Sequence, residues 1–224
     1  MFLVLMVLAL GVLANSATSN DSQLNNNKRL LSVQERLNIA ADDVKSFSIN
    51  SLDKSEVLIS FSEAKSKNFV QEIAGGNNLE VKTIYHIFKG KNNQFSGAYF
   101  VPQNQNLNEA ILKYEQGIKE TIDFQVKENE VTLMKYKEKL ALMLRNRSTT
   151  DEKYLEEEKS VNSLLQLLED QKERQSVLHE KGLELYGLKV VAKNDVLAKL
   201  AINPAIKSIE KISGHNVTWS PIVP

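Results

Sequence analysis

Two long stripes of apolar residues in the second half of the chain constrain its fold more than any other feature. The first stripe runs from Leu107 to Met143. After the polar break RNRSTTDEK (145–153), the second stripe continues to residue 182. The spacing predicts two helices that pair as an antiparallel coiled-coil hairpin over residues 103–183. At a rise of 1.5 Å per residue, a helix of about 40 residues is about 60 Å long, more than a small domain spans, so the hairpin is expected to project as an insertion. The first stripe recurs in steps of three and four, with one interruption at Asn129: Leu107, Ile111, Tyr114, Ile118, Ile122, Val126, Leu133, Tyr136, Leu140 and Met143.

The segments on either side of the hairpin carry strand and helix patterns. The β-branched and aromatic content predicts strands, and the Gly75-Gly76 pair is a natural helix end. Before the hairpin these segments are EVLISFS (56–62, strand), EAKSKNFVQEIAGG (63–76, helix), LEVKTIYHIF (79–88, strand) and FSGAYFV (95–101, strand). After it they are LYGLKVVAK (185–193, strand), NDVLAKLAIN (194–203, helix) and AIKSIEKI (205–212, strand).

Without the hairpin, the order is strand, helix, strand, strand, helix, strand. This is the split βαβ, or ferredoxin-like, order, in which two helices cover one face of an antiparallel sheet. The sequence therefore predicts an α+β fold, with a discontinuous ferredoxin-like domain over 51–102 and 184–212 that the helical hairpin interrupts. Both 95–101 and 185–192 fit the third strand, and the sequence leaves this choice open.

The first residues, MFLVLMVLALGVLANSATSN, have the pattern of an export signal. The apolar run from Phe2 to Ala14 is shorter than the roughly 20 residues of a membrane-spanning helix. Ala14 and Ser16 supply the small residues of a cleavage site, which predicts a signal peptide over 1–16 and a secreted or extracytoplasmic protein. An uncleaved membrane anchor is the alternative. A secreted chain without cysteine suits a bacterium better than an animal.

Three further segments complete the predicted organisation. Residues 17–31 are rich in Ser, Asn and Asp without periodicity, which is typical of a flexible linker. Ser32 and Glu35 form a capping-box pattern before an amphipathic helix in 32–50. The last segment, SGHNVTWSPIVP (213–224), has two prolines and no periodicity, so we expect an extended tail.

Composition and motifs argue against several classes of function. Lys+Arg and Asp+Glu are both 28, so no basic surplus exists to bind nucleic acid. The absence of cysteine excludes disulfides and thiolate metal sites. His86, His179 and His215 are far apart in sequence, and no nucleophile-elbow, Walker A, H-E-x-x-H or dinucleotide motif is present. We therefore expect no catalytic residues, no metal site and no cofactor, and thus a non-enzymatic binding protein.

Parts of the sequence outside the hairpin resemble the subtilisin-propeptide family (inhibitor I9). Residues Asn203–Glu210, NPAIKSIE, match the Asn-Pro-x-Val-x-x-Val-Glu ending of that family, with Ile in place of Val. Phe95, Ser96 and Gly97 match its aromatic-x-Gly segment. The long helical insertion departs from the family pattern, and no protease domain follows before Pro224, so any such activity is expected in trans.

The resemblance implies a stand-alone inhibitor or folding chaperone of a subtilisin-like serine protease. In that family the segment after the last strand lies in the substrate groove of the protease. Residues 213–224 would be that segment, since extended peptides place alternate side chains in pockets of a partner. The expected partner-contacting residues are His215, Val217, Trp219, Ile222 and Pro224. A terminus that simply packs on its own domain is the alternative.

The second hypothesis is an envelope-associated scaffold or assembly protein that acts through the hairpin, by self-association or by reaching a protein partner. The simpler role of the apolar stripes is to join the two helices of the hairpin to each other. The two hypotheses separate by deletion. Removal of 213–224 should abolish inhibition, and removal of 104–182 should abolish assembly and leave a stable small domain.

Overall fold

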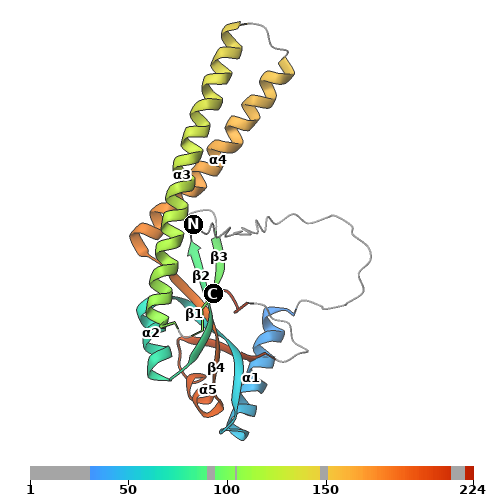
Figure 1. The fold of residues 1–224 in the computed structure, drawn as a ribbon. Coiled ribbons are helices and arrows are strands. Elements are labelled where there is room, and N and C mark those ends of the chain that lie inside the picture. The colour runs from blue at the N-terminus through green and yellow to red at the C-terminus, as the bar shows by residue number, and fades with distance from the viewer. Residues whose placement is uncertain (1–30, 90–93, 104, 147–150, 213–219) are drawn as a thin grey trace. The chain divides into compact units, whose positions relative to one another are not determined.

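The computed structural model describes residues 31–224 except 90–93, 104, 147–150 and 213–219 (Figure 1). The predicted signal peptide and nearly all of the predicted linker lie outside the described residues. Within the described part the elements follow in the order α1 Val33–Ile49, β1 Lys54–Ser66, α2 Lys67–Gly76, β2 Glu80–Lys89, β3 Gln94–Phe100, α3 Leu107–Asn146, α4 Asp151–Lys181, β4 Glu184–Lys193, α5 Asn194–Leu200 and β5 Ile206–Lys211.

Serine side chains set the start of the first two helices. The Ser32 hydroxyl accepts a hydrogen bond from the Glu35 backbone N–H at 3.3 Å, and the Glu35 carboxylate accepts one from Ser32 N–H at 2.8 Å. This confirms the predicted capping box. Strand β1 is longer than predicted and α2 starts later, because Ser66 caps α2 by accepting from Phe69 N–H at 3.3 Å.

The five strands form one antiparallel sheet in the order β3-β2-β4-β1-β5 (Figure 1). Strand β4 lies between β1 and β2 and is antiparallel to both, so β1, α2 and β2 make a βαβ unit that β4 splits. The order β5-β1-β4-β2 is that of the ferredoxin-like fold, which confirms the predicted fold class. It also assigns the third strand to β4, whereas β3 is an added edge strand paired with β2.

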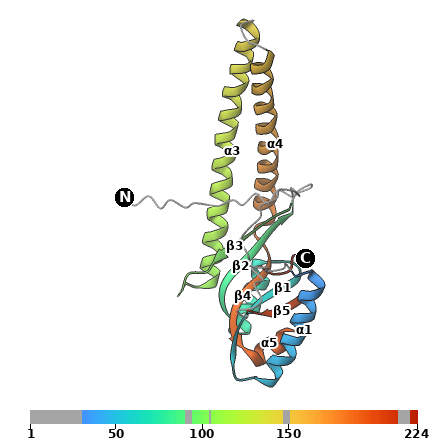
Figure 2. The same cartoon turned by 90° about the vertical axis from the view of Figure 1, so that its right-hand side faces the viewer.

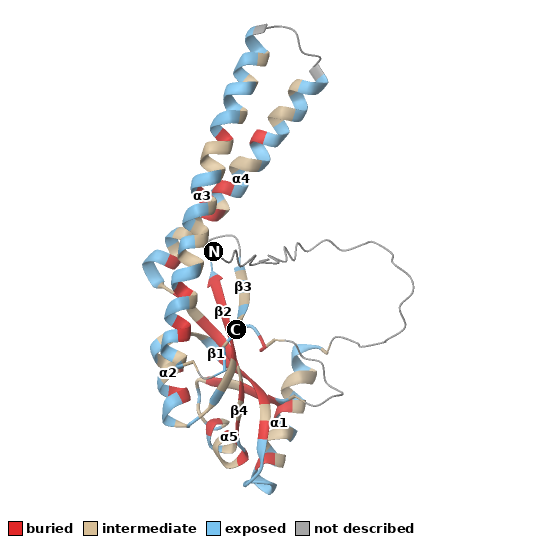
Figure 3. Ribbon diagram, in the orientation of Figure 1, coloured by how far each residue is buried: buried red, intermediate tan, exposed pale blue. Residues whose placement is uncertain are grey.

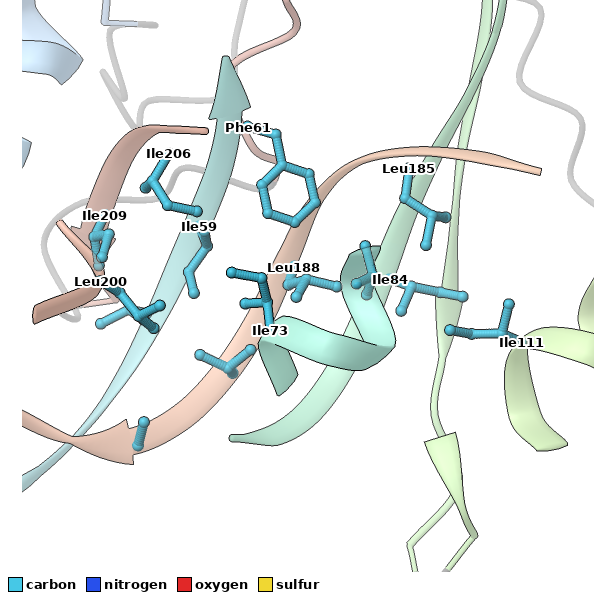
Figure 4. Close-up of a cluster of buried hydrophobic side chains, with 14 of the residues drawn as sticks. Ile59, Phe61, Ile73, Ile84, Ile111, Leu185, Leu188, Leu200, Ile206 and Ile209 are labelled. Atoms are coloured by element: carbon cyan, nitrogen blue, oxygen red, sulfur yellow. The ribbon is translucent and has the colours of Figure 1, made fainter. Parts of the chain in front are cut away.

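The main core lies between one face of the sheet and the helices, and Leu188 is central to it because it pairs with Ile59 on one side and with Ile84 on the other (Figure 4). Helix α1 packs beside β5 and α5 (Figure 2). Its Phe47 is fully buried. The residues of this core are Phe47, Val57, Ile59, Phe61, Val70, Ile73, Ile84, Phe88, Ile111, Leu178, Leu183, Leu185, Leu188, Val190, Ala192, Leu197, Leu200, Ile206 and Ile209.

The base of the helical hairpin belongs to this same core. Ile111 of α3 and Leu178 of α4 are fully buried within it. Farther along, the two helices bury a seam of their own, formed by Val126, Leu133, Val161 and Leu168 (Figure 3). Where Asn129 interrupts the stripe, its side-chain amide donates to the Gln171 side-chain oxygen at 2.7 Å across the seam. Residues Leu31–Pro224 thus form a single unit, and the hairpin is anchored in the domain.

Candidate functional site

The second face of the sheet, opposite the main core, carries both apolar and polar buried residues. Leu58, Tyr85, Ile87 and Tyr186 form a separate buried cluster there. Ser60 and Glu210, on neighbouring strands, are also buried, at 0% and 3% exposed. Buried polar side chains in a sheet need hydrogen-bond partners, so these two mark a place where another part of the chain contacts the sheet.

That part is the end of the C-terminal segment, Ser220–Pro224. The Ile222 backbone N–H donates to the Ser60 hydroxyl at 2.8 Å, and the Ile222 side chain is only 2% exposed. The Lys207 ammonium donates to the Val223 carbonyl at 3.2 Å. The segment is therefore held through its backbone by side chains of β1 and β5.

Gly187 of β4 makes room for the proline of this segment. A methyl group at Gly187 would overlap the Pro221 ring and would lie 2.5 Å from the Ile59 carbonyl oxygen. Since any larger side chain would meet the same two obstacles, glycine is required where the segment approaches the sheet.

A partly buried ion pair connects α1, β5 and the C-terminal segment. The Arg36 guanidinium donates to both carboxylate oxygens of Glu210, at 2.8 and 2.7 Å, and also to the Ser220 carbonyl at 2.8 Å. The Ser208 hydroxyl lies 3.4 Å from the same carboxylate. Bidentate geometry of this kind fixes orientation as well as charge, so Arg36 positions the start of the segment.

Helix α1 is tied to β5 at a second point, where the Asp43 carboxylate accepts from Lys211 N–H at 2.8 Å. Burial raises the pKa of Asp43, although this hydrogen bond and the Lys211 charge act in the opposite direction. These contacts hold Arg36 over the sheet from the side of β5.

The structure describes two of the five predicted partner-contacting residues, Ile222 and Pro224. Ile222 is buried on the second face and Pro224 is partly exposed. His215, Val217 and Trp219 lie outside the described residues. The sequence prediction missed every residue that receives the segment: Arg36, Ser60, Gly187, Lys207 and Glu210.

Comparison of the chain with protein-family models, with curated proteins and with solved structures finds no match.

His86, on β2, is another buried titratable side chain. It is 6% exposed, and its Nδ1 lies 3.1 Å from the Tyr114 hydroxyl of α3. Burial lowers the pKa of His86 to about 4 and raises the pKa of Tyr114, whose ring stacks on Tyr99 at 4.3 Å between centroids. His86 is thus neutral at physiological pH and packs against the Cα of Gly97, which is typical of a structural histidine that joins the hairpin to the sheet.

The other histidine that the structure describes, His179, lies on the surface. His179 of α4 is 3.0 Å from the Asp123 carboxylate of α3, and both are exposed on the hairpin. Among the described residues, no group of three or more His, Asp and Glu side chains is arranged to hold a metal ion. Over the same part of the chain, none of the helices has the length and apolar character to cross a membrane.

Proposed function

We propose that this protein is an exported, non-enzymatic binding protein that acts on a protein partner through its C-terminal segment. The partner class we propose is a subtilisin-like serine protease, for which the chain serves as a stand-alone inhibitor or folding chaperone. The observation that carries the proposal is the way in which the backbone of Ser220–Pro224 is bound, although in the isolated chain this segment packs on its own domain, as the alternative for the tail expects. The backbone groups at Ser220, Ile222 and Val223 are met by side chains of other elements, as in peptides that bind along a cleft.

The NPAIKSIE segment supports the proposal because it fixes β5, the strand after which the tail begins. The Asn203 side-chain oxygen accepts from Ala205 N–H at 2.9 Å, and Asn203 O accepts from Ile206 N–H at 2.9 Å. This turn leads directly from α5 into β5 and places Ile206 and Ile209 in the core. The last strand is thereby fixed, and the chain leaves it toward the C-terminal segment.

A capture experiment and an inhibition assay test this function. The bait is the chain from Ala17 to Pro224, and the matched control ends at Ser213, so that the two differ only in the tail. We expect the intact chain alone to capture a subtilisin-like protease from secreted and envelope fractions and to inhibit it in a peptide-hydrolysis assay. Equal capture by both chains, or the absence of inhibition over a panel of such proteases, would refute the proposal.

A second candidate function is an assembly role of the hairpin, and a specific observation favours it. Large apolar side chains in the distal half of the hairpin are exposed: Met134 (58%), Leu142 (56%), Leu144 (60%) and Leu155 (51%). Contiguous exposed apolar surface is what marks a site of protein association, and these four side chains are the part of the distal hairpin that could contribute to one. For this function we propose a second copy of the chain as the partner, through pairing of two hairpins.

Sedimentation velocity over a concentration series tests the assembly role. We expect reversible dimerisation that is lost in the Leu142→Lys/Leu144→Lys variant. The matched control is Leu112→Lys, which changes an exposed leucine at the base of the same helix and should leave dimerisation intact. A monomer at all concentrations would refute this alternative.

A further inference from the structure

The place where the C-terminal segment meets the sheet has the features of a built peptide-binding site. We call it the docking groove and define it by Arg36, Ser60, Gly187 and Lys207. Its members come from four different elements, α1, β1, β4 and β5. Ser60 is completely buried, and Arg36 is oriented by Glu210, whose side chain is 4% exposed.

The contacts in the groove divide into two kinds. Three hydrogen bonds go to backbone atoms of the segment, namely Ser220 O, Ile222 N and Val223 O. Such contacts recognise an extended chain of any sequence. Selectivity comes from two side chains instead, because Pro221 lies against the glycine of β4 and Ile222 is enclosed on the sheet.

We infer that the docking groove is a peptide-binding site for an extended Ser-Pro-Ile-Val-Pro sequence. Residues 220–224 occupy this site reversibly and act as a latch that holds the end of the chain on the sheet. The bound segment forms no strand of its own and is held by three hydrogen bonds and the burial of Pro221 and Ile222. A ligand attached to the same chain has an effective concentration of about 1 mM, so even a weak site stays occupied in cis.

The test uses the full-length chain carrying Ile222→Asp and a fluorescein-labelled peptide with the sequence of residues 220–224. An aspartate at this buried position opens the latch, because an unpaired carboxylate is costly to bury. We expect saturable binding of the peptide to this variant in fluorescence anisotropy. The wild-type chain should bind the peptide at least about tenfold more weakly, because its own segment competes at the effective concentration of a tethered ligand.

Two serines of the same strand provide a matched pair of further variants in the Ile222→Asp background. Ser60→Ala removes the acceptor for the peptide backbone and should weaken binding about 3- to 10-fold, as expected for one hydrogen bond. Ser62→Ala changes a serine that is exposed and donates to Ala205 O, and it should leave the affinity unchanged. A peptide with Asp in place of Ile should not bind.

Several outcomes would overturn the assignment of the groove. One is the absence of saturable peptide binding to an Ile222→Asp chain whose circular dichroism spectrum matches the wild type. Another is equal affinity of the wild-type and Ile222→Asp chains. In the unmodified protein, exchange of the Ile222 amide at the rate of an unprotected peptide would also overturn it, since this N–H donates to a buried hydroxyl.

A role of the latch in regulating protease binding rests on the proposed function. If the segment must leave the groove before it binds a protease, Ser60→Ala with an intact tail should bind the protease about 3- to 10-fold more tightly than the wild type. Equal affinities would refute the latch as a regulator while the peptide site stands. Failure of every variant to bind a protease would refute the proposed function, and the peptide-binding result would be unaffected.

Discussion

Replacement of Ile111 by alanine tests whether the helical hairpin is anchored in the domain core. Ile111 lies in the first turns of α3, is 0% exposed and belongs to the same cluster as the central strands. If the hairpin were only tethered to the domain, the loss of this side chain would have little effect. Because it is part of the core, the substitution removes buried apolar volume from the domain itself.

The magnitude follows from the atoms removed. Ile→Ala deletes three carbon groups, which at about 0.8 kcal/mol each correspond to about 2.4 kcal/mol of transfer free energy. A residual cavity of about 50 Å³ adds about 1.2 kcal/mol at about 24 cal/mol per Å³. The higher helix propensity of alanine returns only a few tenths of a kcal/mol. We expect the free energy of unfolding to fall by about 3 kcal/mol, within the usual range of about 2 to 5 kcal/mol for this change.

Urea unfolding measures this loss, followed in parallel by far-UV circular dichroism, which reports on the helices and strands, and by near-UV circular dichroism, which reports on side-chain packing. The matched control is Leu112→Ala, a neighbouring apolar residue of the same helix that is 52% exposed and should cost less than about 0.5 kcal/mol. Coincident transitions for the two probes are required before the values are compared. A loss below about 1 kcal/mol for Ile111→Ala, or equal losses for the two variants, would refute the anchored hairpin.

Three further predictions concern the junction between the hairpin and the sheet. The pKa of His86 is lowered from 6.5 to about 4, so between these values the unfolded chain binds a proton that the folded chain does not. The free energy of unfolding should therefore fall by up to about 3 kcal/mol as pH drops from 6.5 to 4, and His86→Gln should remove this dependence in urea titrations. Gly97→Ala places a methyl group against the His86 ring and should cost about 1 to 3 kcal/mol; an unchanged unfolding midpoint would contradict it. Burial raises the pKa of Glu115, but hydrogen bonds from Lys119 and Lys67, both at 2.8 Å, outweigh this effect and lower the pKa. Glu115→Gln should therefore lower the free energy of unfolding by about 1 to 3 kcal/mol at neutral pH. The difference between the two proteins should become smaller as pH falls below 4.5, because the wild-type carboxylate is then protonated.

The order of strands and helices was predictable because local patterns decide it, but the place of each strand in the sheet was not. Two segments fitted the third strand, and only long-range pairing separates them. A difference in pattern nevertheless indicates the answer. The segment FSGAYF alternates between exposed and half-buried residues, as an edge strand does, whereas LYGLKVVA is buried almost throughout, as a central strand covered on both faces should be.

The apolar stripes predicted the hairpin and its seam, but they could not show where the seam ends and the domain core begins. Ile111 and Val126 occupy equivalent positions in the stripe, yet the first packs in the domain and the second against the opposite helix. This changes the deletion that tests a scaffold role. Removal of 104–182 would also take Ile111 and Leu178 from the core, so the expectation of a stable small domain without the whole hairpin is unfounded. The cut has to leave the base of both helices in place.

The docking of the C-terminal segment has a cause in the sheet itself. An antiparallel sheet commonly keeps one face in water, but here the second face also carries a buried cluster, with Tyr85 and Tyr186 in edge-to-face contact at 6.0 Å. Ser60 and Glu210, which are buried on the same face, need polar partners and so determine what can cover the part of the face next to them. A helix has few free backbone donors to offer a buried hydroxyl, whereas an extended segment presents N–H and C=O groups along its length. Residues 220–224 therefore lie on this face because its buried polar groups need the backbone groups of an extended peptide. No periodicity in the tail is involved. A partner that binds the tail must offer its backbone groups hydrogen bonds at least as favourable as those of the groove.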